Sequence, residues 1–186
     1  MSEQESSAAK TSGYEKLEAI LGQAGDLLPP GDGVGSPRGF LVQAGRQSSG
    51  GKGVRRHAND RAWLEQPITE IQRDVGTAFA LGQAMKKVQE AERMPVDQAL
   101  EELKGAIVYL AAWCAVTEEI WDPQGDHGVP DPGKMAEHPH FQDTLRQIHQ
   151  TLFCASMEQE LAAGHRAIAA VAQLATRITE LAEGPE

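Results

Sequence analysis

Residues 105–116, GAIVYLAAWCAV, constrain the fold most, because they are apolar on every face when wound into a helix. The surrounding segment also carries a seam with alternating spacings of three and four, which is typical of one helix face: Leu100, Leu103, Ile107, Leu110 and Cys114. Together they predict a long helix that begins near Pro95 and is covered on several sides. Such a helix is either the centre of the domain or also an oligomer interface.

Two further helices are expected on either side of it. The first runs to about Arg93 and begins near Asn59 or Asp60, or near Gln66 because proline at 67 is tolerated only in a first turn. The third runs from about residue 138 to 182, and its seam shifts phase by about one residue, which predicts a bend near Gly164 or two consecutive helices. No stretch alternates with period two. We therefore predict an all-α fold, an antiparallel bundle of three long helices.

We predict that residues 1–57 form a flexible N-terminal arm and that residues 58–186 form a helical bundle domain. A short helix over 14–23 is expected from one apolar stripe. Residues 24–57 contain nine glycines and three prolines, a linker composition. Residues 33–59 contain no acid but hold five basic residues, so the arm is Gly-rich and basic: Arg38, Arg46, Lys52, Arg55 and Arg56.

Charge and cysteine content narrow the classes of function. The net charge is −10, and residues 58–186 hold ten Lys or Arg against twenty-one Asp or Glu. Binding to nucleic acid is therefore not expected except through the arm, and binding to membranes is not expected at all. The only cysteines, Cys114 and Cys154, lie in apolar helical patterns, and no segment resembles a signal peptide or a membrane span. A cytoplasmic protein is expected.

A cluster of acids is the strongest candidate for a site. If the chain reverses at Met94 and Pro95, residues whose numbers sum to about 189 lie at the same height in the two helices. On a helical wheel, Glu118 lies about 50° from the apolar seam of the second helix, and Asp74 lies about 80° from the seam of the first. Glu119 is expected to point away from the seam. Acids at the carboxyl end of a helix are unfavourable and need positive partners. In this register six acids gather at one end of the bundle: Glu65, Glu70, Asp74, Glu118, Glu119 and Asp122.

Two interpretations of this cluster remain open. In the structural one, Arg55, Arg56 and His57 neutralise the acids in a salt-bridge network. In the functional one, Asp74, Glu118 and Asp122 bind Mg²⁺ through oxygen ligands, while Lys52, Arg55 and Arg56 bind the phosphate of a ligand. The loop histidines His127, His138 and His140 lack zinc spacing and favour solvated side chains.

The string EEIWD (118–122) is similar to the ExxD motif of the all-α MazG-type nucleotide pyrophosphohydrolases, with Glu119 and Asp122 in the matching positions. The string ELKGAIVYLAAW (102–113) resembles the apolar helix of that family. The EExxE motif is missing, since residues 65–74 read EQPITEIQRD, and motif and apolar run occur in reversed order. The resemblance implies magnesium and a nucleotide substrate.

Two functional hypotheses follow, from different classes. The first is a helical interaction or assembly protein without intrinsic catalysis, either a homo-oligomer or bound to another protein. The alternative is a MazG-like, Mg-dependent nucleotide pyrophosphohydrolase. A third hypothesis, an acidic mimic of nucleic acid, is supported only by the charge of residues 58–186.

Overall fold

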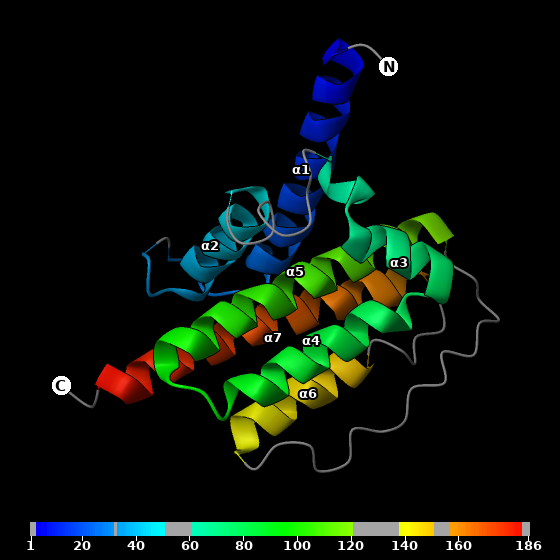
Figure 1. Ribbon diagram of the computed structural model, residues 1–186. Coiled ribbons are helices and arrows are strands. Elements are labelled where there is room, and N and C mark those ends of the chain that lie inside the picture. The colour runs from blue at the N-terminus through cyan, green and yellow to red at the C-terminus, as the bar shows by residue number, and fades with distance from the viewer. Residues whose placement is uncertain (1–2, 32, 51–60, 121–137, 151–156, 184–186) are drawn as a thin grey trace.

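The computed structural model of the 186-residue chain describes residues 3–31, 33–50, 61–120, 138–150 and 157–183 (Figure 1). Throughout these ranges the fold is all-α, and no strand occurs. Nor is any helix in these ranges long and apolar enough to cross a membrane. The elements are α1 (Glu3–Asp26), α2 (Pro37–Gly50), the 3-10 helix η2 (Trp63–Glu65), α3 (Pro67–Val75), α4 (Ala78–Ala91), α5 (Val96–Ile120), α6 (Pro139–Gln150) and α7 (Met157–Glu183).

Helix α5 is the central element. It packs against α1, α2, α3, α4 and α7, and Figure 1 shows it running through the middle of the molecule with α7 alongside. Its residues 110–117 are all buried, which is the all-round burial that the apolar run predicts. The prediction of a central helix is confirmed, and α5 obtains its cover from helices of its own chain.

Helices α4 and α5 form the antiparallel pair expected from a reversal at Met94 and Pro95. The Nζ of Lys87 lies 2.6 Å from Oε2 of Glu102. The rings of Phe79 and Tyr109 meet edge to face with centroids 6.4 Å apart. In both pairs the residue numbers sum to about 189, so the predicted register is present.

The three long helices do not occur as such, because the first is divided. Gln66 has an extended backbone, as expected before a proline, and α3 begins at Pro67. Gly76 then takes a φ of 98°, a conformation that favours glycine, and ends α3 before α4 begins at Ala78. The third helix is likewise two consecutive helices, α6 and α7, which pack against each other. Residues 151–156, between them, lie outside the described part.

Helix α2 lies where glycine content predicted a flexible linker, and for residues 37–50 that prediction is wrong. Phe40, Leu41, Ala44 and Ser48 are buried and recur at spacings of one, three and four, so one face of α2 docks on the bundle. The ammonium of Lys104 on α5 lies 5.8 Å from the centroid of the Phe40 ring. Burial of this face outweighs the poor helix propensity of Gly39 and Gly45. Helix α1 is also longer than the expected residues 14–23.

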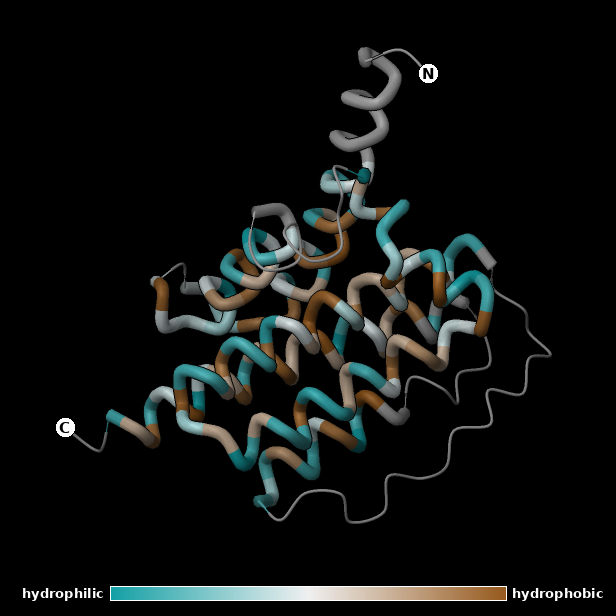
Figure 2. The backbone as a smooth tube through the Cα atoms, in the orientation of Figure 1, coloured by the Kyte–Doolittle hydropathy of each residue, from teal (hydrophilic) through white to brown (hydrophobic). Residues whose placement is uncertain are grey.

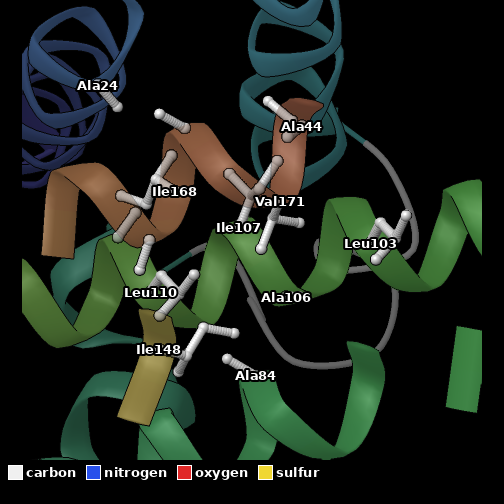
Figure 3. Close-up of a cluster of buried hydrophobic side chains, with 14 of the residues drawn as sticks. Ala24, Ala44, Ala84, Leu103, Ala106, Ile107, Leu110, Ile148, Ile168 and Val171 are labelled. Carbon is white, nitrogen blue, oxygen red and sulfur yellow. The ribbon is translucent and has the colours of Figure 1, made fainter. Parts of the chain in front are cut away.

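One hydrophobic core joins the helices. Figure 3 shows small and branched side chains from six of them converging: Ala24, Ala44, Ala84, Ile107, Ile148 and Val171. Figure 2 shows hydrophobic and hydrophilic residues interleaved along α4, as expected for a helix with one buried face. Helices α5 and α7 approach closely at Gly164, where an added Cβ would lie 2.6 Å from Sγ of Cys114 and from the Trp113 ring.

Candidate functional site

Arg73, on α3, forms an ion pair with Glu119 near the carboxyl-terminal end of α5. Its guanidinium donates to both carboxylate oxygens of Glu119, from Nε at 2.9 Å and from Nη2 at 3.2 Å. A third bond runs from Nη1 to the carbonyl oxygen of Leu64, at 2.8 Å. The hydrogen bond with Glu119 raises the pKa of Arg73, burial opposes this, and the charges of Glu119, Glu70 and Glu65 add to the rise. These carboxylates therefore lie close together, as the hairpin predicted. The prediction that Glu119 points away is wrong, because its carboxylate is bound by Arg73 of α3.

Two other acids of this end, Glu118 and Glu70, are also paired with bases. The Nζ of Lys16, on α1, forms an ion pair with Oε2 of Glu118. The guanidinium of Arg61 lies 2.7 Å from Oε1 of Glu70. A salt-bridge cluster is therefore present, but its described bases are Lys16, Arg61 and Arg73, which the sequence reasoning did not select. Across the described ranges, no group of three or more His, Cys, Asp or Glu side chains is arranged to hold a metal ion.

The residues of the hypothetical magnesium site are only partly visible in the structure. Asp74 lies exposed near the end of α3. Glu118 lies on α5 and is engaged by Lys16. Asp122 lies outside the described residues, as do the three proposed phosphate ligands, Lys52, Arg55 and Arg56. The structure thus gives no arrangement for the complete set.

A small pocket of about 120 Å³ lies beneath Glu118, between α1, α5 and α7. It is lined by Lys16, Cys114 and His165, among others. Burial raises the pKa of the Cys114 thiol to about 12, so the thiol is protonated and a poor nucleophile at neutral pH. Burial also lowers the pKa of His165, and the charge of Glu118 partly opposes that shift.

His138 immediately precedes α6 and His140 lies in its first turn; both are exposed, with ring centroids 5.1 Å apart. The backbone N–H of His138 donates to a carboxylate oxygen of Glu92 at 2.5 Å. Their exposure agrees with the solvated interpretation. His127 lies outside the described residues.

A groove of about 700 Å³ lies between α1 and α2, and sequence reasoning missed it. Leu17, Leu21 and Leu41 form its floor, and Val42, with 53% of its surface exposed, stands at its edge. Three glycines widen it or allow the helices to approach: Gly22, Gly25 and Gly45. The signal that could have revealed it is the spacing of Phe40, Leu41 and Ala44, which marks a helix within the presumed linker.

The two lips of this α1–α2 groove carry opposite charges. Glu18 and Asp26 line it from α1, whereas Arg38 and Arg46 line it from α2. Arg38 also donates from Nη2 to the carbonyl oxygen of Leu28 at 3.2 Å, which ties the basic lip to the turn after α1. The groove therefore combines an apolar floor with one acidic and one basic wall.

Comparison with known protein families, with curated proteins and with solved structures gives no match to this chain.

Proposed function

We propose that this chain is a helical interaction protein, without intrinsic catalysis, that assembles with a second copy of itself through the α1–α2 groove. The observation that carries the proposal is the opposite charge of the two lips, Glu18 and Asp26 on α1 against Arg38 and Arg46 on α2. A two-fold axis parallel to the groove places α1 of each copy over α2 of the other. Acidic and basic lips then meet on both sides of the interface.

The apolar part of such an interface comes from the edge of the groove, because its floor residues are buried. Val42 lines the groove and is 53% exposed, and Leu27, which follows α1 outside the groove lining, is also 53% exposed. Covering exposed apolar side chains is the main favourable contribution to association, while the charged rim sets orientation and register. A second copy satisfies both requirements with one surface.

Charge reversal of the lips gives a sharp test by size-exclusion chromatography with light scattering. Wild type is expected to be a dimer at tens of micromolar. Glu18→Arg with Asp26→Arg makes both lips basic, and Arg38→Glu with Arg46→Glu makes both lips acidic, so each variant alone is expected to be monomeric. An equimolar mixture of the two is expected to form a heterodimer, because every lip then faces its opposite.

The control is Arg146→Glu, which reverses an exposed charge on α6, away from the groove, and is expected to leave the dimer intact. Circular dichroism checks that all variants remain helical. A monomeric wild type at these concentrations, or dimers that ignore both reversals, would overturn the proposal.

The alternative, a MazG-like, Mg-dependent nucleotide pyrophosphohydrolase, has one observation in its favour. Asp74 has no ion-pair partner within the described ranges, and it lies near the end of α3, whose Arg73 contacts Glu119. Against it, Glu118 must first leave Lys16 before it can bind a cation. Asp122 and the basic residues Lys52, Arg55 and Arg56 would complete that site.

A further inference from the structure

A second pocket, of about 370 Å³, lies between α2, α3, α4 and α5 and shares no residue with the α1–α2 groove. Its apolar wall consists of Ile68, Ile71, Phe79, Val108 and Tyr109. The edge-to-face pair of Phe79 and Tyr109 gives this wall an aromatic surface against which a flat ring can pack. The volume suits a small organic molecule.

Two glutamine side chains border the same pocket with unused hydrogen-bonding atoms. Gln66 is only 5% exposed, and its Nε2 is buried with no hydrogen-bond partner among the described residues. Gln47 donates from Nε2 to Oε2 of Glu101 at 3.3 Å, while its buried Oε1 has no partner there either. A buried polar atom without a partner costs about 1–3 kcal/mol. The pocket therefore borders one unsatisfied donor and one unsatisfied acceptor.

The charged groups around the pocket neutralise one another. Nζ of Lys87 lies 2.6 Å from Oε2 of Glu102, and Nζ of Lys104 lies 2.8 Å from Oε1 of Glu101. Gly105 makes room for the first pair, since a Cβ there would lie 3.0 Å from Cε and Nζ of Lys87. With both acids paired, the pocket offers no net charge to a ligand, and an ionic ligand would have to break one of these pairs.

We propose that this pocket binds a small, uncharged aromatic molecule that carries a carboxamide or an equivalent pair of neighbouring donor and acceptor groups. The ring packs against Phe79 and Tyr109. Nε2 of Gln66 donates a hydrogen bond to the acceptor of the ligand, and the donor of the ligand donates to Oε1 of Gln47. Such a ligand covers the apolar wall and gives a partner to each of the two unsatisfied amide atoms. Because it is uncharged, it leaves both ion pairs intact.

Benzamide is the simplest probe of this chemistry, and benzoate is its charged counterpart of the same size. In a titration followed by ¹H–¹⁵N correlation spectra of the full chain, benzamide is expected to give saturable shifts centred on Gln66, Ile68 and Tyr109. Benzoate is expected to bind at least about tenfold more weakly.

Two variants test the assignment. Gln66→Leu removes the donor at nearly constant volume, and Ile71→Trp fills the pocket from a position that is 39% exposed and so tolerates a larger side chain. Each is expected to weaken benzamide binding by about tenfold or more. Gln98→Leu, at an exposed position of α5 outside the pocket, is the matched control and leaves binding unchanged.

Three results would overturn the proposal. The first is the absence of saturable shifts with benzamide up to about 10 mM, the weak limit for a fragment of this size. The second is equal binding of benzoate. The third is unchanged binding by the Ile71→Trp variant, which does not depend on whether Gln66→Leu folds.

Discussion

Arg73 and Glu119 are joined by two parallel N–H to oxygen contacts, at 2.9 Å and 3.2 Å, and this pair fastens α3 to the carboxyl-terminal end of α5. The same guanidinium also binds the carbonyl oxygen of Leu64, so the turn before α3 is held by the same side chain. Bidentate Arg–carboxylate geometry is the most effective form of ion pair near a protein surface.

Glu119→Gln is expected to lower the free energy of unfolding by about 0.5–1 kcal/mol, because the pair is partly exposed and screened by solvent. Arg73→Met is expected to lower it more, since the Leu64 carbonyl also loses its donor. Urea denaturation of both single variants and the double variant measures the coupling. Glu90→Gln, which breaks the exposed pair with Lys86 at 3.6 Å, serves as the control and should show a smaller loss. Equal losses for Glu90→Gln and Glu119→Gln would contradict this ranking.

Gly164→Ala and Gly82→Ala are expected to change stability in opposite directions. At Gly164 a Cβ would lie 2.6 Å from Sγ of Cys114, so α5 and α7 must separate, at a cost of about 1–3 kcal/mol. At Gly82 a Cβ meets nothing within 4 Å, and alanine in a helix is favoured over glycine by about 0.5–1 kcal/mol. Thermal and urea unfolding of the two variants provide the test. A stabilised Gly164→Ala variant would show that the two helices are not in close contact.

His165 is expected to make the protein less stable in acid. Burial lowers its pKa below the ordinary 6.5. The unfolded chain then binds more protons than the folded one as the pH falls below 6.5, so the free energy of unfolding decreases in that range. The groups that face it across its pocket are Lys16, Cys114 and Glu118, of which Glu118 favours the charged form. Urea unfolding at a series of pH values should show a smaller decrease in His165→Gln than in wild type, and identical pH profiles would refute the assignment.

Mg²⁺ and Mn²⁺ are expected not to raise the melting temperature, alone or with a panel of nucleotides. The physical reason is that Glu118 already has a cationic partner in Lys16. The measurement is a thermal shift assay, with Ca²⁺ as a control for general ionic effects. A shift that is present in wild type and lost in both Asp74→Asn and Glu118→Gln would instead favour the metal-dependent enzyme.

The sequence carried strong information about α5 and its pairing with α4, because an apolar run and a proline-marked reversal act locally. The break at Gly76 was not predicted, since glycine lowers helix propensity without dictating a positive φ. Helix α2 was missed because its glycines and serines resemble a linker until the docking partner of Phe40 is known. Its stability comes from tertiary packing, which composition does not report.

The acidic residues at the end of α3 and α5 were likewise predictable only in part. Their grouping around Arg73 follows from hairpin register, which the residue numbers fix. The pairing of Glu118 with Lys16 depends on where α1 docks, and nothing in the hairpin determines that. The charged α1–α2 groove likewise exists only once the two helices lie side by side.

The central place of α5 bears on how the molecule comes apart. Because α1, α2, α3, α4 and α7 all rest on this one helix, removing any of them uncovers apolar surface on their shared support. Such an arrangement has no separable half that could persist while the remainder melts. Loss of order is therefore expected to be a single, all-or-none event shared by these six helices.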